Sequence, residues 1–217
     1  SIRLDRARKG ERRAQVMKAA RAAGIAVEET NAEALDRQAG NSNHQGVVAR
    51  CRAAAERNEA DLKNFLTELP GKPLLLVLDG IQDPHNLGAC LRSADAAGAN
   101  AVILPRDNSS PITPVVRKVA SGAAETLPVF QVTNLARVLD ELKAAGVWLA
   151  GAAGEAEQEL YDVDLHGPTA LVLGAEGTGL RRLTRDKCDY LVRIPMAGTV
   201  ESLNVSVAAG ICLFEAV

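Results

Sequence analysis

The chain has 217 residues, of which 47% are hydrophobic and 24% charged, with a formal net charge of −2. This composition is that of a globular protein and excludes a disordered tail. No apolar run approaches the roughly 18 residues of a membrane span, so we expect no membrane association. The charged start of the chain lacks the apolar core of a signal peptide. Aromatic residues are only 3%, which argues against RNA binding by base stacking.

The cysteines and histidines are scattered along the chain. They are Cys51, Cys90, Cys188, Cys212, His44, His85 and His166. None of them has the spacing of a zinc site, so we expect no metal. Unpaired cysteines are typical of a cytoplasmic protein whose thiols stay reduced, and we expect that location here.

The charge is unevenly distributed. Residues 1–72 carry 14 Lys and Arg against 10 Asp and Glu, whereas residues 73–217 carry 11 against 17. The basic excess is concentrated in Arg3, Arg6, Arg8, Lys9, Arg12, Arg13, Lys18 and Arg21. Such a patch attracts a phosphate backbone. Charge alone is equally compatible with a solvated helix face.

A small α/β domain is predicted over residues 1–52. Residues 11–23 have helical spacing, and Gly24 ends the run. The apolar face of that helix comprises Ala14, Met17, Ala20 and Ala23. Strands are expected at residues 25–29 and from Gln45, with a helix between them that Asn31 caps and that runs through Gln38.

Residues 53–73 are predicted to be a polar linker with a helical turn or two. Pro70, Gly71 and Pro73 punctuate the end of this stretch, as is typical of a loop. We therefore place the second domain at residues 74–217.

In the second domain, apolar runs alternate with helical stretches. The expected strands are 74–79, 101–104, 128–132, 147–151, 169–174 and 190–195, and the expected helices are 85–97, 113–120, 134–145, 180–187 and 203–216. This alternation predicts an α/β fold with a parallel sheet covered on both faces. Ligands of such sheets bind beyond the carboxyl ends of the strands. The turns after Leu78, Leu173 and Ile194 are therefore the candidate site.

The first of these turns leads into a helix with polar residues near its start. Asp83 is placed to cap the helix and Pro84 to occupy its first position. Asn86 then lies in the first turn, and the long side chain of Arg92 leans back toward it. These groups converge near a helix N-terminus, which favours anions. A capped helix with a surface arginine explains the pattern equally well.

The second turn contains three glycines around one acid. Gly174, Gly177 and Gly179 flank Glu176 directly after an apolar strand. Glycine permits positive φ and close approach of a ligand to the backbone. The spacing is not the G-x-G-x-x-G of dinucleotide-binding folds, which disfavours a dehydrogenase. A structural turn with a surface glutamate remains an alternative.

The third turn precedes the last helix. We predict that Ser202 caps this helix and that Asn204 lies in its first turn. Leu203, Val207, Gly210 and Phe214 form one stripe of the helix, either buried or facing a partner.

Together the segments DPHNLGACLRSADAAGA, LVLGAEGTGLRRLTR and IPMAGTVESLNVSVAAGICLFEAV resemble the three motifs of the SpoU (TrmH-type) family of RNA ribose 2′-O-methyltransferases, in the SPOUT superfamily. The likeness spans residues 74–217. It is strongest to members that modify a guanosine in the peptidyl-transferase-centre loop of 23S rRNA. Residues 1–52 resemble the family's L30e-like substrate-binding domain, mainly through HQGVVAR at 44–50. The family also leads us to expect further residues before Ser1.

The resemblance implies a trefoil knot at the C-terminal end of the sheet domain and S-adenosyl-L-methionine as cofactor. By motif position, the cofactor contacts are Gly174, Ile194 and Leu203, with Pro195 and Met196 beside them. The catalytic positions are Asn86, Arg92, Glu176, Ser202 and Asn204. The family also implies a homodimer with the last helix at the interface. The implied substrate is 23S rRNA or a ribosome assembly intermediate.

Two interpretations of Arg92 remain open. The family casts this arginine as general base, but a guanidinium normally stays protonated and could instead stabilise a developing alkoxide. Alternatives for the whole protein are the same chemistry on tRNA or another rRNA, and an RNA-binding relative without catalysis. Because all five polar positions are filled, we favour an enzyme.

Overall fold

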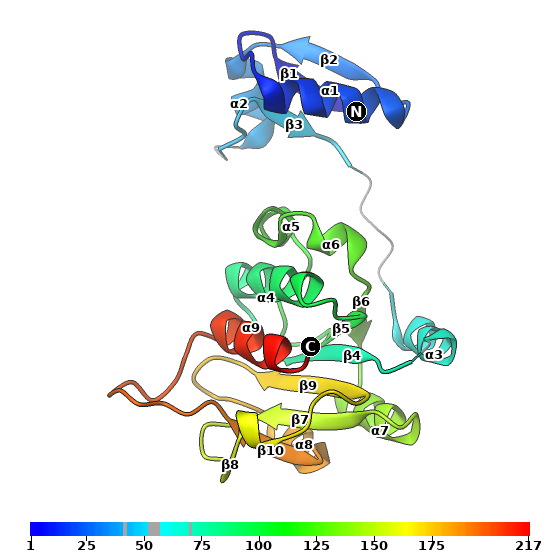
Figure 1. Ribbon diagram of the computed structural model, residues 1–217. Helices are drawn as coiled ribbons and strands as arrows, with labels where there is room; N and C mark the ends of the chain where they lie inside the picture. The colour runs from blue at the N-terminus through cyan, green and yellow to red at the C-terminus, as the bar shows by residue number, and fades with distance from the viewer. Residues whose placement is uncertain (41–42, 52–56, 70) are drawn as a thin grey trace. The chain divides into compact units, whose positions relative to one another are not determined.

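The protein is described by a computed structural model that covers residues 1–40, 43–51, 57–69 and 71–217 (Figure 1). It divides into two compact units, Ser1–Ala54 and Ala55–Val217.

The first unit is a three-stranded sheet with two helices. Its elements are β1 (Ile2–Asp5), α1 (Glu11–Ala22), β2 (Val27–Thr30), α2 (Ala32–Ala39) and β3 (Val47–Ala49). The strand order is β2-β1-β3, with β1 parallel to β2 and antiparallel to β3. As predicted, the Asn31 side chain caps α2 by accepting a 2.9 Å hydrogen bond from Ala34 N. Strand β1 was not predicted, because four residues among charged neighbours show no clear alternation.

Helix α1 lies where it was predicted but buries less than expected. Of its predicted apolar face, only Ala20 is buried, while Ala14 is exposed. The leucines Leu4 and Leu35 supply most of the small core of this unit.

The second unit is a parallel sheet with helices. Its strands are β4 (Leu74–Asp79), β5 (Ala101–Pro105), β6 (Val129–Val132), β7 (Trp148–Ala152), β8 (Gln158–Glu159), β9 (Thr169–Gly174) and β10 (Tyr190–Arg193). Its helices are α3 (Glu59–Glu68), α4 (Pro84–Ala96), α5 (Pro114–Ala120), α6 (Ala123–Thr126), α7 (Leu135–Ala144), α8 (Arg182–Lys187) and α9 (Val205–Glu215), with a 3-10 turn at Leu160–Asp162. The strand order is β6-β5-β4-β9-β7-β10-β8, and all these pairings are parallel. The predicted α/β class is thereby confirmed.

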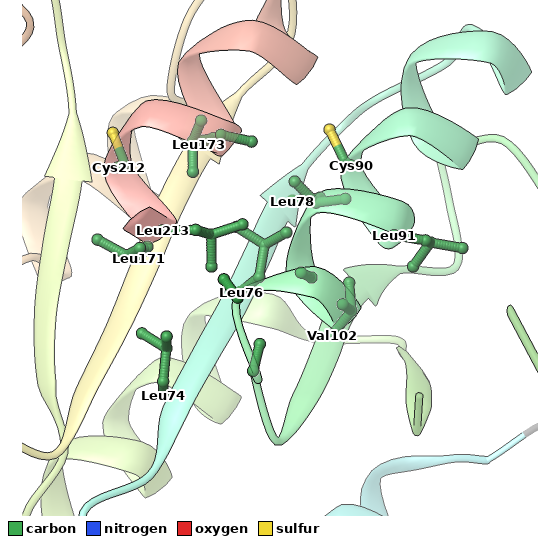
Figure 2. Close-up of a cluster of buried hydrophobic side chains, with 14 of the residues drawn as sticks. Leu74, Leu76, Leu78, Cys90, Leu91, Val102, Leu171, Leu173, Cys212 and Leu213 are labelled. Atoms are coloured by element: carbon green, nitrogen blue, oxygen red, sulfur yellow. The ribbon is translucent and has the colours of Figure 1, made fainter. Parts of the chain in front are cut away.

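Both faces of the sheet are covered, as the continuous apolar strands predict. Alternate residues of β4 point to opposite faces, so Leu76 joins the core under α4 and α9, whereas Val77 joins the core under α7. Figure 2 shows the first of these cores. Leu76 and Leu173 from the sheet belong to the same cluster as Cys90 of α4 and Cys212 of α9. This packing holds α4 and α9 side by side over β4 and β9.

Helix α3 belongs to the second unit, although it lies in the stretch predicted as a linker. Its Leu62 is buried in the core of the α7 face, and its Glu59 accepts hydrogen bonds from the start of α7. The helix begins with a capping box between Asn58 and Asp61. The segment is mostly polar, so its few apolar residues, Leu62, Phe65 and Leu66, did not indicate a helix that packs on the sheet. Of the predicted linker, residues 53–56 and Pro70 lie outside the described residues, as does residue 52 of the predicted first domain.

Candidate active site

The start of α4 follows directly from its sequence. Asp83 accepts a 2.9 Å hydrogen bond from His85 N, and Pro84 is the first helical residue, as predicted. Because the cap fixes where the helix begins, it also fixes the position of Asn86 in the first turn. Asn86 lies at the carboxyl end of the sheet, just beyond β4.

The glycine segment after β9 folds back on itself. Ala175 pairs with Gly179, whose N–H donates a 2.9 Å hydrogen bond to the Ala175 carbonyl. Gly177 and Gly179 have φ values of 81° and 65°, a region that favours glycine. A Cβ at Gly174 would overlap the backbone of Gly179. Three glycines are therefore required to make this tight loop, which holds Glu176 at its tip.

The cap of α9 differs from the prediction. Asn204, not Ser202, is the N-cap residue, and its Oδ1 accepts hydrogen bonds from Ser206 N at 2.9 Å and Ser206 Oγ at 2.6 Å. Ser202 is exposed and lies two residues before the N-cap, outside the helix. Both residue types are good N-caps, so the sequence pattern alone does not distinguish them.

One hydrogen-bonded chain joins the three segments. Asn204 Nδ2 donates to Asn86 Oδ1 at 2.9 Å, and Asn86 Nδ2 donates to Glu176 Oε2 at 3.2 Å. Each segment thus contributes one polar side chain to a single cluster, although the three residues are spread over 118 positions of the chain. Three of the five predicted catalytic positions are brought together in this way.

A cleft of about 790 Å³ lies at the same end of the sheet. Its walls are residues 152–155, 173–180, 192–194, 196, 201–203, Arg185, Val205 and Ala208. This volume is within the range of sites for cofactors and other small molecules. Of the predicted cofactor positions, Gly174, Ile194, Met196 and Leu203 line the cleft, as do Glu176 and Ser202.

The charges in the cleft suit a cationic ligand. Glu176 and Glu201 lie on its walls. The two wall arginines are each paired with a carboxylate: Arg185 with Glu155, which also lies on the wall, and Arg193 with Glu159 at 3.0 Å. Carboxylates without a compensating cation favour positive charge, such as that of a sulfonium.

Four of the predicted site residues are not among those that line this cleft, namely Asn86, Arg92, Pro195 and Asn204. Arg92 is exposed and lies six positions beyond Asn86, which places it on the outer side of α4. The inner side of the helix carries buried residues such as Leu87 and Leu91. On α9, which packs beside α4, Val207 and Phe214 are more than half exposed. Two members of the predicted α9 stripe are thus exposed rather than buried.

Sequence reasoning missed two parts of the site. The first is the wall formed by residues 152–155 after β7. A signal was available, because the predicted strand at 147–151 ends at the same sheet edge and is followed by Gly154. The second is the buried Asp79, which accepts hydrogen bonds from Arg181. The sequence shows Asp79 at the end of a strand, but nothing in the local pattern indicates that Arg181 is its partner.

The described residues contain no group of three or more acidic, histidine or cysteine side chains that could hold a metal ion. All four cysteines are free, as predicted. Burial raises the pKa of Cys90 and Cys212 to about 12, so these thiols stay protonated and unreactive. Among the described helices, none combines the length and apolarity needed to cross a membrane.

Comparison with known proteins identifies the family. A model of the SpoU rRNA Methylase family matches residues 73–214, and a model of the RNA 2′-O ribose methyltransferase substrate-binding domain matches residues 2–57. The chain belongs to the SpoU rRNA methylase family. The matched region of this SpoU chain contains all three joined segments.

Individual relatives give the same result. The chain is 60% identical over 210 residues to the 23S rRNA (guanosine-2′-O-)-methyltransferase RlmB of Ralstonia nicotianae, covering 97% of this chain and 84% of the relative. It is 57% identical over 210 residues to the protein of the same name from Shewanella oneidensis, covering 97% and 85%. A solved structure, the SpoU methyltransferase AviRb from Streptomyces viridochromogenes in complex with AdoMet, matches with a TM-score of 0.80 and 27% identity, covering 99% of this chain and 80% of that one.

Proposed function

We propose that this protein transfers a methyl group from S-adenosyl-L-methionine to the ribose 2′-hydroxyl of a guanosine in 23S rRNA. The observation that carries the proposal is the hydrogen-bonded chain from Asn204 through Asn86 to Glu176 beside a cleft of cofactor size. The RlmB relatives, which match almost the whole chain, support the rRNA substrate. Such a substrate is consistent with a cytoplasmic protein.

The cofactor is proposed to bind in the cleft at Gly174, Ile194, Met196 and Leu203. Tight folding of the glycine loop leaves its backbone accessible to a ligand, and the acidic walls suit a cation. When bound, S-adenosyl-L-methionine supplies a methyl group on a positively charged sulfur, which is already a strong electrophile. The fit of the cleft is supported by the AviRb structure, which is a complex with the cofactor AdoMet.

The protein must then orient the ribose and stabilise its oxygen while the hydroxyl proton passes to water, the methyl group moves to that oxygen and the sulfur leaves as a neutral thioether. Asn86 and Asn204 hold each other and Glu176 in fixed orientations, so these groups can bind the ribose or the adjacent phosphate without rearrangement. Arg92 is proposed to remain charged and to stabilise the developing alkoxide. Ser202, on the cleft wall, is proposed to contact the reacting groups.

The exposed position of Arg92 favours a homodimer with a shared site. Arg92 is exposed on α4, and the helix packed beside it, α9, exposes the apolar side chains of Val207 and Phe214, so the two helices present a partly apolar surface. We propose that this surface is the subunit interface and that Arg92 reaches the cleft of the partner subunit. A C-terminal trefoil knot, which the family resemblance implies, remains a prediction.

The first unit is proposed to bind RNA. Of the eight cations in its basic N-terminal stretch, six are exposed, namely Arg6, Arg8, Lys9, Arg12, Lys18 and Arg21. Arg3 and Arg13 pair with Glu28 and Glu29 and are thereby partly neutralised. The exposed cations attract the phosphate backbone of 23S rRNA or of a ribosome assembly intermediate, so binding weakens as salt rises.

The test is transfer of labelled methyl groups in vitro to 23S rRNA, with tRNA and 16S rRNA as competing substrates. Label confined to one guanosine ribose of 23S rRNA supports the proposal. Label on tRNA or on 16S rRNA alone would favour the alternative that the protein performs the same chemistry on tRNA or on another rRNA. Cofactor binding without transfer to any RNA would favour a non-catalytic relative.

A further inference from the structure

An ion pair between a buried carboxylate and a half-exposed guanidinium lies at the end of the glycine loop and has no role in the proposed methyl transfer. Asp79 is the last residue of β4, and its side chain has no exposed surface. Arg181 lies just before α8, two residues after the last loop glycine. Its guanidinium is half exposed, at 49%. The pair therefore links the interior of the sheet to the surface beside the cleft.

The carboxylate holds both the backbone and the side chain of Arg181. Asp79 Oδ2 accepts a 3.0 Å hydrogen bond from Arg181 N, whereas Oδ1 accepts from Nε at 2.6 Å and lies 2.5 Å from Nη2. Charge-assisted bonds of this kind are stronger than neutral ones and restrict geometry. A buried carboxylate needs such partners, because without them its desolvation is unfavourable.

These contacts fix both ends of the glycine loop against one strand. At its first end, Gly174 pairs with Asp79 in the register of β4 and β9. At its last end, Arg181 is bonded to the same aspartate. The loop between them is only six residues long, and its cross-loop pair between Ala175 and Gly179 leaves little freedom. Its tip carries Glu176, which bonds to Asn86.

Asp79 also begins the turn that leads to α4. The residue after it, Gly80, has a φ of 88°, and α4 starts four residues later with Asn86 in its first turn. Asp79 is thus tied to two segments. It pairs with the start of the loop that bears Glu176 and bonds to its end, and it begins the turn that leads to Asn86. A displacement of the loop relative to β4 changes the distance between those two side chains.

We propose that Asp79 and Arg181 are positioning residues for methyl transfer. They hold the glycine loop in the position relative to β4 in which Glu176 is hydrogen-bonded to Asn86. In that position the loop backbone forms part of the cleft wall. This inference rests on the proposed function, because it assigns the pair to the same cleft. Neither residue contacts the reacting atoms in this account, so both act through the loop.

The experiment compares three variants with the parent protein. Arg181→Met removes the guanidinium but keeps an apolar side chain. Arg181→Lys keeps the positive charge but loses the two guanidinium nitrogens that contact Asp79. Asp79→Asn removes the negative charge but keeps the size of the side chain and an oxygen that can accept the hydrogen bond from Arg181 N. The matched control is Arg182→Met, because Arg182 is the adjacent residue and is 92% exposed, with only an i,i+4 pair to Asp186 at 3.7 Å. Calorimetry with S-adenosylhomocysteine measures binding, and amide hydrogen exchange measures opening of residues 175–179.

We expect Arg181→Met to weaken S-adenosylhomocysteine binding at least tenfold and to speed exchange in the loop, with exchange in α4 and α9 unchanged. Arg181→Lys should recover part of the binding, and Arg182→Met should match the parent within twofold. If Arg181→Met does not fold, the same binding and exchange changes are expected of Asp79→Asn. Folded variants with parental binding and loop exchange would overturn the inference, even if their melting temperature falls.

These outcomes are separate from those of the proposed function. If the parent protein binds S-adenosylhomocysteine but methylates no RNA, the proposed function fails while the loop measurements still decide the role of Asp79 and Arg181. If the parent transfers methyl groups to 23S rRNA and Arg181→Met does so at the parental rate with parental affinity, only the positioning inference fails.

Discussion

Asn204 Nδ2 donates a 2.9 Å hydrogen bond to Asn86 Oδ1, and this bond joins the N-cap of α9 to the first turn of α4. The two helices are already held together by the core that they share over β4 and β9. Packing therefore sets the approximate distance, and the amide pair sets the orientation of polar groups toward the cleft. The Asn204 side chain thus does two things: its oxygen caps α9, and its nitrogen bonds to Asn86 in the polar cluster.

These two roles of Asn204 can be separated by mutation. Asn204→Ser keeps an N-cap oxygen but removes the donor to Asn86, so we expect a change in unfolding free energy of only a few tenths of a kcal/mol. Loss of one hydrogen bond of about 1 kcal/mol corresponds to about fivefold slower methyl transfer. Asn204→Ala should show the same kinetic loss and a further destabilisation of about 1 kcal/mol.

The measurements are urea denaturation and single-turnover methyl transfer on both variants. Equal destabilisation by serine and alanine would mean that the cap is not the stabilising element. Parental transfer by Asn204→Ser would show that the bond to Asn86 has no part in the reaction.

Arg92 is expected to be essential for transfer and dispensable for cofactor binding. Removing a charge that stabilises a developing oxyanion costs about 100-fold or more in rate. We therefore expect Arg92→Ala to lose transfer by that factor and to bind S-adenosylhomocysteine within twofold of the parent. High activity of Arg92→Lys would indicate simple charge stabilisation, whereas near-parental turnover of Arg92→Ala would reject the role.

The shared-site arrangement predicts complementation between subunits. Arg92→Ala and Glu176→Ala should each be inactive alone. If Arg92 reaches the partner's cleft, a mixed dimer contains one intact site, and random mixing should restore about a quarter of the parental activity. Absence of any recovery after mixing and reassociation, with dimers shown by light scattering, would mean that Arg92 acts within its own subunit.

Gly174 is expected to tolerate no side chain. A Cβ there would overlap the backbone of Gly179, which cannot move without opening the loop. Gly174→Ala should therefore abolish measurable cofactor binding while the sheet remains folded. Gly167→Ala is the matched control, because its Cβ meets nothing within 4 Å. Calorimetry checks both variants, and retained binding by Gly174→Ala would contradict the described loop.

Much of the second unit was predictable from the sequence, for a clear physical reason. Buried parallel strands such as Leu74–Asp79 are continuous apolar runs, and the pair Asp83 and Pro84 marks a helix start without ambiguity. The polar residues at the strand ends could be recognised because sheet topology places them at one edge.

The remainder depends on contacts between distant residues. Glu59 lies in a polar stretch that looks like a linker, and its partners Thr133 and Asn134 are more than 70 positions away. The partner of Asp79 is 102 positions away. Ser202 and Asn204 are both suitable caps, and only the packing of α9 decides between them. Local patterns contain none of this information.

Glu59 should make stability depend on acid. Hydrogen bonds from Asn134 N, followed by those from Thr133 and Arg137, lower its pKa from 4.5 to about 2. The ionised form is thus favoured in the folded state, and the stabilisation is complete above about pH 4.5 and is lost as the pH falls toward 2. Because the site is open to solvent, screening reduces the contribution to about 1 kcal/mol.

Urea denaturation of the parent and of Glu59→Gln between pH 7 and pH 2.5 checks this prediction. The difference in unfolding free energy should be complete at pH 7 and should shrink steadily as the pH falls from 4.5 to 2.5. Glu68→Gln, an exposed residue of the same helix, should follow the parent. A constant difference at every pH would contradict the assignment to ionisation of Glu59.

The most direct test of the whole account is transfer of labelled methyl groups by the parent protein to 23S rRNA, followed by mapping of the modified ribose. The account predicts one labelled guanosine, modified at its 2′-oxygen, and no labelling by Arg92→Ala. Label on a base, or no label on any RNA despite bound cofactor, would contradict it.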